Sequence, residues 1–200
     1  MGRQTRVTLH QLFPTAADRD RIIKTYGAIE GGKQTLARLA DYLPSMAAKK
    51  ADLVITRMFD APRALVWKAW TDPKQVAQWW GPRGFTNPLY EWDARPGGAI
   101  LVHMRGPAGS AFDMVLPMKG VFHEVTVPER LVFTSTALED AAGNPQLEML
   151  NTITFEEYNG KTKLTLHAKV VKAAPAVAGA IAGMEQGWTQ SLERLDALLR

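Results

Sequence analysis

Six strand-like runs follow one another between residues 86 and 170 with no long helix among them, and this succession restricts the fold most. Turn sequences separate the runs, and Asn159-Gly160 is a strong signal for a two-residue hairpin. Strands joined in this way pair antiparallel. The sequence therefore predicts an antiparallel sheet built from residues 86–93, 99–105, 114–127, 130–136, 147–157 and 162–170.

Helical segments accompany this sheet. A further strand is expected at 53–59, followed by two short helices at 60–70 and 74–80, the first capped by Asp60. The closing segment, 183–199, is expected to be a long helix with one apolar face, which holds Met184, Trp188, Leu192, Leu195 and Leu199. These elements predict an α+β fold in which a curved antiparallel sheet wraps around the carboxy-terminal helix and leaves a space beneath it.

The amino-terminal part of the chain repeats the last strand and the closing helix. Residues 7–10 match residues 164–167, and residues 31–39 match residues 187–195, at separations of 157 and 156 residues. Matches that keep their register over both segments predict a shared strand-and-helix unit. The chain therefore carries a fragment of a second copy of the domain.

The predicted boundary follows from this repeat. Residues 1–46 are expected to be the partial copy and residues 51–200 the complete domain, with a linker over 44–50. The fragment has no sheet of its own to cover its apolar stripe, which consists of Ile22, Ile23, Ile29, Leu36, Leu39 and Leu43. We expect it to dock on the complete domain or to join two chains in a homodimer.

Residues 53–199 carry a set of motifs that occur together in one known family. The motifs are Ile55–Pro62, Val66–Pro73, Gln78–Pro82, Arg95–Gly98, Pro117–Val121, Glu129–Thr134 and Gly183–Trp188. They resemble the bacterial activator-of-Hsp90-ATPase homologues of the SRPBCC superfamily, which includes START and birch-pollen-allergen proteins. The resemblance implies the helix-grip fold, with a hydrophobic cavity under the long helix. It implies no fixed chemistry.

The composition excludes several classes of function. The chain has no cysteine, and therefore no disulfide, thiolate nucleophile or sulfur-ligated zinc. It has no run of 18 apolar residues and no secretory signal, which predicts a cytoplasmic protein without a membrane partner. Residues 1–50 carry nine Lys and Arg against four Asp and Glu, whereas residues 51–200 carry fifteen against sixteen. The basic residues are spread out rather than clustered, so no nucleic-acid partner is expected.

Aromatic and methionine side chains are the candidates for the cavity wall, because they offer apolar area that adapts to varied ligands. Trp188 is expected to be buried, so its replacement by alanine would cost about 3–5 kcal/mol. The four histidines form no metal-binding pattern, and we expect neither a metal nor another cofactor. The predicted ligand contacts are Trp80, Trp92, Met104, Phe112, His123, Met149, Met184 and Trp188.

Three functions compete at this stage. The first is binding of a small hydrophobic or amphipathic molecule between the sheet and the closing helix. The second, suggested by the family name, is a co-chaperone-like interaction that activates an Hsp90-type ATPase. The third is an enzyme of cyclase or hydrolase type that works in the cavity. No set of residues marks a catalytic site, so the sequence favours binding.

Overall fold

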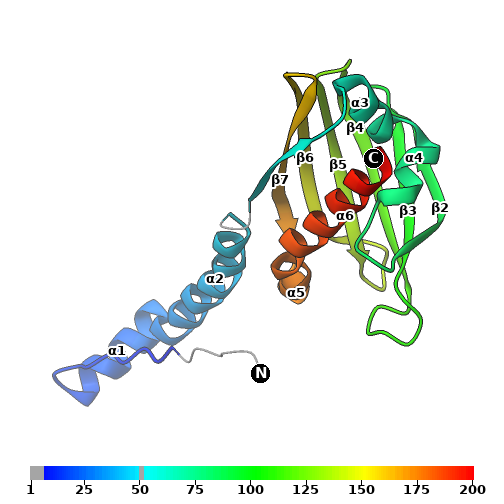
Figure 1. The fold of residues 1–200 in the computed structure, drawn as a ribbon. Coiled ribbons are helices and arrows are strands. Elements are labelled where there is room, and N and C mark those ends of the chain that lie inside the picture. The colour runs from blue at the N-terminus through cyan, green and yellow to red at the C-terminus, as the bar shows by residue number, and fades with distance from the viewer. Residues whose placement is uncertain (1–6, 50–51) are drawn as a thin grey trace. The chain divides into compact units, whose positions relative to one another are not determined.

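The computed structural model describes residues 7–49 and 52–200 (Figure 1). The chain forms two compact units, Met1–Pro44 and Ser45–Arg200. Helix α1 (Ala16–Tyr26) lies in the first unit, and α2 (Ala28–Lys49) begins there. Gly27 separates the two helices because its left-handed backbone, with φ of 61°, ends α1.

The amino-terminal residues differ from expectation in two respects. Residues 7–10 form no strand, and α2 continues past Leu43 to Lys49, so the segment predicted as a linker is helical over residues 44–49. A strand needs a neighbour for its backbone hydrogen bonds, whereas a helix satisfies them within itself. Residues 46–49 are Met, Ala, Ala and Lys, which favour helix, and α2 therefore continues past the proline.

The second unit contains one sheet and its covering helices (Figure 1). Its strands are β1 (Leu53–Phe59), β2 (Thr86–Trp92), β3 (Ala99–Arg105), β4 (Val115–Thr126), β5 (Arg130–Glu139), β6 (Pro145–Tyr158) and β7 (Lys161–Ala173). Its helices are α3 (Arg63–Thr71), α4 (Pro73–Trp79), α5 (Ala178–Ala182) and α6 (Met184–Leu199), with a 3-10 turn, η1, at Pro175–Val177.

The sheet is antiparallel throughout, in the order β1-β7-β6-β5-β4-β3-β2. Each of the seven strands expected in residues 51–200 is present, and β1 and β3 have the expected bounds. Asn159 and Gly160 both have positive φ, 49° and 77°, as the tight hairpin between β6 and β7 requires. The prediction of an α+β fold with an antiparallel sheet is confirmed.

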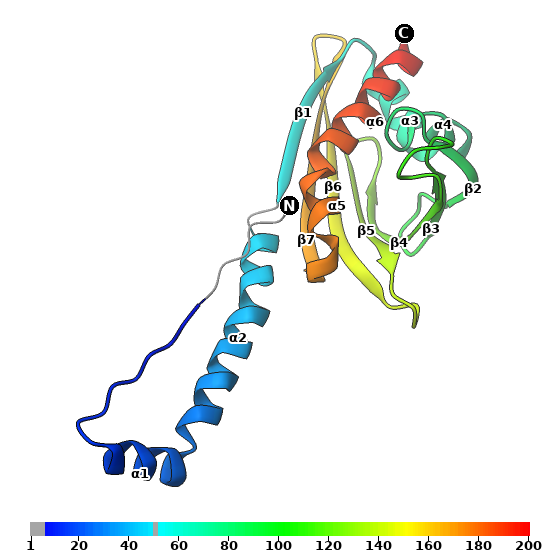
Figure 2. The ribbon, with the colours of Figure 1, turned by 90° about the horizontal axis from the view of Figure 1, so that it is seen from below.

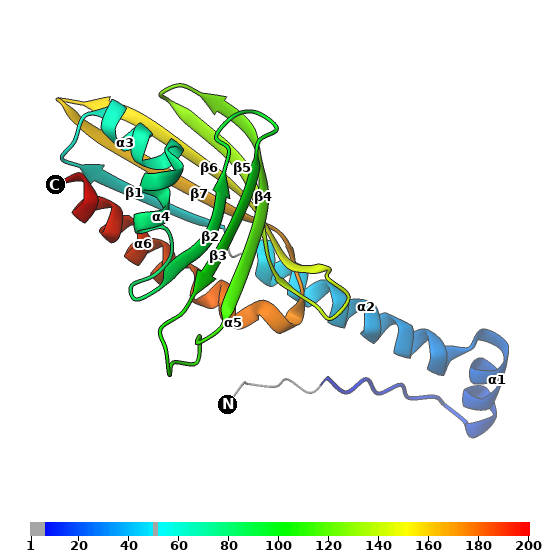
Figure 3. The same ribbon diagram turned by 90° about the vertical axis from the view of Figure 1, so that its right-hand side faces the viewer.

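Bulges and a glycine let the sheet curve around α6 (Figure 2). The register shifts between Phe122 and Glu124 on β4 and between Glu148 and Met149 on β6. Such shifts bend a strand and increase its twist. Gly120 allows the backbones of β4 and β5 to approach closely, because a Cβ at this position would lie 2.0 Å from the carbonyl oxygen of Thr134. The view from the β2 and β3 side shows α5 and α6 inside the curve (Figure 3).

Two details of the helices differ from expectation. Helix α3 begins at Arg63 with Pro62 at its N-cap, and no side chain caps it, so Asp60 is not the cap. Asp60 stands too far before the first turn for its carboxylate to reach the free N–H groups. The Ala- and Gly-rich segment between β7 and α6 forms two elements that are not predicted from the sequence, η1 and α5. Asp72 does cap α4, accepting from the Lys74 N–H at 2.9 Å.

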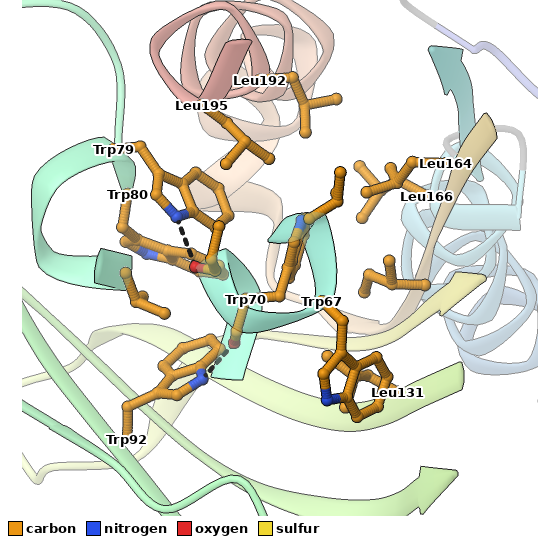
Figure 4. Close-up of a cluster of buried hydrophobic side chains, with 14 of the residues drawn as sticks. Trp67, Trp70, Trp79, Trp80, Trp92, Leu131, Leu164, Leu166, Leu192 and Leu195 are labelled. Carbon is orange, nitrogen blue, oxygen red and sulfur yellow. Dashed lines mark hydrogen bonds between the residues drawn. The ribbon is translucent and has the colours of Figure 1, made fainter. Parts of the chain in front are cut away.

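The core lies where α3, α4 and α6 meet the concave face of the sheet, and tryptophans fill much of it (Figure 4). The ring of Trp70 lies 4.7 Å from that of Trp79 and 6.2 Å from that of Trp80, between centroids. The indole N–H of Trp79 donates to the Ala69 carbonyl at 2.9 Å, and that of Trp92 donates to the Trp70 carbonyl at 2.8 Å. These bonds satisfy indole groups that burial removes from water.

Candidate functional site

A cavity of about 230 Å³ lies between α6 and the concave face of β3 to β6. It separates the tryptophan-rich core from a smaller apolar cluster that includes Leu147, Val170 and Val177. The cavity thus lies under the closing helix, where a space is predicted from the sequence. Its wall contains five of the predicted contact residues, which are Trp80, Met104, Met149, Met184 and Trp188. Binding of a ligand by these five stays a prediction.

Trp188 is less buried than expected. It lies at the boundary of the core, with its ring 6.3 Å from that of Trp70 at 17° and 5.2 Å from that of Trp80. One side of it faces the cavity, and the residue is only partly buried. We therefore expect replacement by alanine to cost less than the 3–5 kcal/mol typical of a fully buried aromatic.

Trp92 does not line the cavity, although it points to the concave face. Its ring packs against Trp80 at 4.8 Å, Phe122 at 5.3 Å and Phe133 at 5.6 Å, and 3% of the residue is exposed. Together with the hydrogen bond to Trp70, these contacts enclose the indole. Trp92 is a core residue, so its prediction as cavity lining is wrong.

Phe112 and His123 also lie outside the cavity wall. Phe112 belongs to the loop between β3 and β4, is 55% exposed and packs against Phe85 at 6.0 Å. His123 follows the fully buried Phe122 at the register shift on β4, and its side chain is exposed. Its Nε2 lies 3.2 Å from the hydroxyl of Thr134. Both are corrections to the predicted wall.

The sequence reasoning missed the small residues that create the space. Ser135 and Ala137 share the inward face of β5 with the buried Phe133, and Ala180 and Gly187 stand opposite them on α5 and α6. The strand alternation that makes Phe133 inward also makes positions 135 and 137 inward, and this signal could have identified them. Where large residues give way to small ones, the sheet and the helix no longer fill the gap. Other lining residues are Gly81, Leu116, Pro117, Met118, Leu138, Leu147 and Ser191.

The wall has little polarity. None of its described residues carries a charged side chain, and its hydroxyl groups belong to Ser135 and Ser191. Asp113 and Asp140 do not line the cavity. The pKa values of both carboxyl groups are lowered, because they accept backbone hydrogen bonds from Gly109 and Asn144.

Among the described residues no three His, Asp or Glu side chains gather as a metal site would require. Nor does any helix there have the length and apolar character to cross a membrane. The arrangement suits retention of an apolar molecule better than acid–base chemistry.

A single arginine fixes the edge of the wall at Trp80 and Gly81. The Arg194 guanidinium donates to the carbonyl oxygens of Gln78, Trp80, Gly81 and Pro82, at 2.7 to 3.3 Å. Burial lowers the pKa of this guanidinium. The side chain thereby ties the end of α4 and the following loop to α6, which holds the lining ring of Trp80 in place.

Comparisons with known proteins agree with this architecture. Residues 60–200 match the model of the Activator of Hsp90 ATPase homolog 1-like protein family. A crystal structure of a protein from Chromobacterium violaceum is 29% identical and covers 75% of this chain and 97% of its own, with a TM-score of 0.65. One from Mycobacterium smegmatis is 27% identical, with coverages of 74% and 90% and a TM-score of 0.62.

A third similar structure, solved by NMR for a protein from Arthrobacter aurescens, is 26% identical and covers 76% of this chain and 87% of its own, with a TM-score of 0.63. A search of curated protein sequences gives no match. The family model spans strands β2 to β7 of the curved sheet, the cavity and α6. The chain therefore belongs to the Activator of Hsp90 ATPase homolog 1-like family, and its second unit has the helix-grip fold.

Proposed function

We propose that the domain binds a small hydrophobic or amphipathic molecule in the cavity beneath α6. The observation that carries this proposal is the wall itself, which combines the rings of Trp80 and Trp188 with several methionines and no charged side chain. Aromatic and methionine side chains adapt to apolar ligands of varied shape. The volume of the cavity, about 230 Å³, lies below the roughly 300–1,000 Å³ of pockets for drug-sized ligands, so the ligand that we propose is smaller than these.

The test fills the cavity from the sheet side. Ala137→Phe places a ring in the space from β5, and we expect it to weaken binding of 2-isopropylnaphthalene at least tenfold, about 1.4 kcal/mol, by isothermal titration calorimetry. Phenylalanine suits a strand, so the sheet should form as before. Ala99→Phe on β3 is the matched control because Ala99 is exposed and does not line the cavity.

Equal affinity of the Ala137→Phe and wild-type proteins would place binding elsewhere. No binding by the wild type would reject an apolar site of this kind. If in that case the domain raises the ATP turnover of an Hsp90-type chaperone, the interaction named in the family description becomes the better account.

We also propose that residues 1–46 are the remnant of a second copy of the domain. In support, the helix pair α1–α2 breaks at Gly27 and the pair α5–α6 breaks at Gly183, which are separated by the same 156 residues as the repeated motif. Apolar side chains stay exposed on this unit, among them Tyr26 at 74% and Ile29 at 55%. Such exposure favours association, and two copies of the chain could meet through these helices.

Deletion of residues 1–46 should leave a folded monomer, because the sheet and both apolar clusters belong to residues 53–199. Circular dichroism should show an intact sheet, and size-exclusion chromatography should give the mass of a single domain. A full-length chain that elutes as a dimer beside this monomer would support association through the fragment. Unfolding of the truncated protein would show that residues 1–46 are an integral part of the fold.

A further inference from the structure

We infer that Ser135 and Asn151 form a polar anchor that selects uncharged ligands carrying a hydrogen-bond acceptor, such as a carbonyl oxygen. The inference rests on the proposed function, since it concerns the chemistry of a ligand in the same cavity.

The anchor is a pair of buried side chains on adjacent strands. Ser135 on β5 is 2% exposed and lines the cavity, and Asn151 on β6 is fully buried. The Asn151 side-chain amide donates to the Ser135 hydroxyl oxygen at 2.9 Å. A polar pair in an otherwise apolar interior costs desolvation free energy, so its presence there calls for a further partner.

The Asn151 amide is oriented with Nδ2 toward the Ser135 oxygen, and this assigned orientation decides what Ser135 can offer. The Ser135 oxygen then accepts, the serine proton has no acceptor among the described residues, and Asn151 Oδ1 is buried without a partner. The Ser191 hydroxyl differs, since it already donates to the Gly187 carbonyl at 2.9 Å within α6. Of the two hydroxyls on the wall, Ser135 is therefore the one that presents a proton to the cavity.

The rest of the wall restricts the ligand further. With no charged side chain among its described residues, the cavity cannot compensate the desolvation of a carboxylate or an ammonium group. A ketone, ester, amide or ether oxygen loses less hydration and can accept from Ser135. The preferred ligand is thus an apolar body with one neutral acceptor directed at β5.

The test compares three ligands of nearly the same shape. 2-Acetylnaphthalene carries the acceptor, 2-isopropylnaphthalene replaces it with an apolar group, and 2-naphthoate carries a charge. We expect the ketone to bind the wild-type protein about 3- to 10-fold more tightly than the hydrocarbon, the range of one neutral hydrogen bond. The carboxylate should bind more weakly than either.

Variants then assign the preference to Ser135. Ser135→Ala should bind the two neutral ligands equally, and the infrared C=O stretch of bound ketone should rise relative to that in the wild type. Because the single change leaves the Asn151 amide without an acceptor, Ser135→Ala/Asn151→Leu removes both partners and serves as the folded reference. Ser191→Ala is the control, and it should keep the preference.

The outcomes separate the inference from the proposed function. Equal binding of ketone and hydrocarbon by the wild type would overturn the anchor while leaving apolar binding intact. A preference that survives Ser135→Ala and the double variant would also overturn it, and would assign the donor to an indole N–H of the wall. Failure of both neutral ligands to bind would instead reject the proposed function.

Discussion

Replacement of Trp70 by alanine should lower the free energy of unfolding by about 3–5 kcal/mol, the loss expected for a large buried aromatic. Trp70 is fully buried and touches the rings of Trp79, Trp80 and Trp188 at the junction of α3, α4 and α6. No other element can fill the space it leaves without breaking those contacts. Chemical denaturation followed by circular dichroism measures the change.

Two comparisons sharpen this expectation. Leu65→Ala on the same helix removes a side chain that is 51% exposed and should cost well under half as much. Trp188→Ala should fall between them because one side of that ring faces the cavity. Equal losses for Trp70→Ala and Trp188→Ala would mean that Trp188 is enclosed as fully as the core.

Replacement of Arg194 by methionine should cost about 2–3 kcal/mol, because it removes a charged donor from four backbone carbonyl groups. Methionine keeps the apolar length of the side chain, so most of the loss comes from the hydrogen bonds. Since Trp80 and Gly81 line the cavity, affinity for 2-isopropylnaphthalene should fall as well. Thermal or chemical unfolding and calorimetry measure the two effects.

Arg200→Met, at the C-cap of the same helix, is the matched control. Arg200 pairs with Asp196 at 2.6 Å on an exposed surface, and loss of such a pair changes stability by less than about 1 kcal/mol. Arg194→Lys should be intermediate, since an ammonium group cannot reach several carbonyls with the planar fork of a guanidinium. If Arg194→Met costs no more than Arg200→Met, the loop after α4 is held by other contacts.

The fold could be predicted from the sequence because its signals are local and agree with one another. Asn159-Gly160 specifies its hairpin, and Asp72-Pro73 specifies the start of α4. The amino-terminal strand failed for a non-local reason. Residues 7–10 resemble β7, yet β7 is a strand because β1 and β6 pair with it. The residues of a segment do not show whether partner strands are present beside it in the fold.

The cavity wall was harder to predict. A residue of the wall must point to the concave face of the sheet, and it must also border empty space rather than packed side chains. His123 lies at the register shift between Phe122 and Glu124, where strand alternation is interrupted, so its exposure could not be read from the sequence pattern. Trp92 points inward as expected, and only the rings packed around it decide that it fills the interior rather than borders a space. Alternation from Phe133 places Ser135 and Ala137 on the inward face, but it does not show whether an inward residue borders a cavity or a filled interior. They form a cavity only opposite Ala180 and Gly187, which are distant in the sequence.

The close packing of the indole rings has an optical consequence. Ring centroids lie 4.7 Å apart for Trp70 and Trp79, 4.8 Å for Trp80 and Trp92, and 5.2 Å for Trp80 and Trp188. At such separations the electronic transition dipoles of neighbouring rings couple, and we expect exciton bands from these pairs in the far-ultraviolet circular dichroism spectrum. Trp80 and Trp188 border the cavity, so a molecule that tilts either ring alters the coupling of the buried rings too. A ligand of the kind we propose would therefore change the protein's own circular dichroism spectrum, and no attached label would be needed to follow its binding.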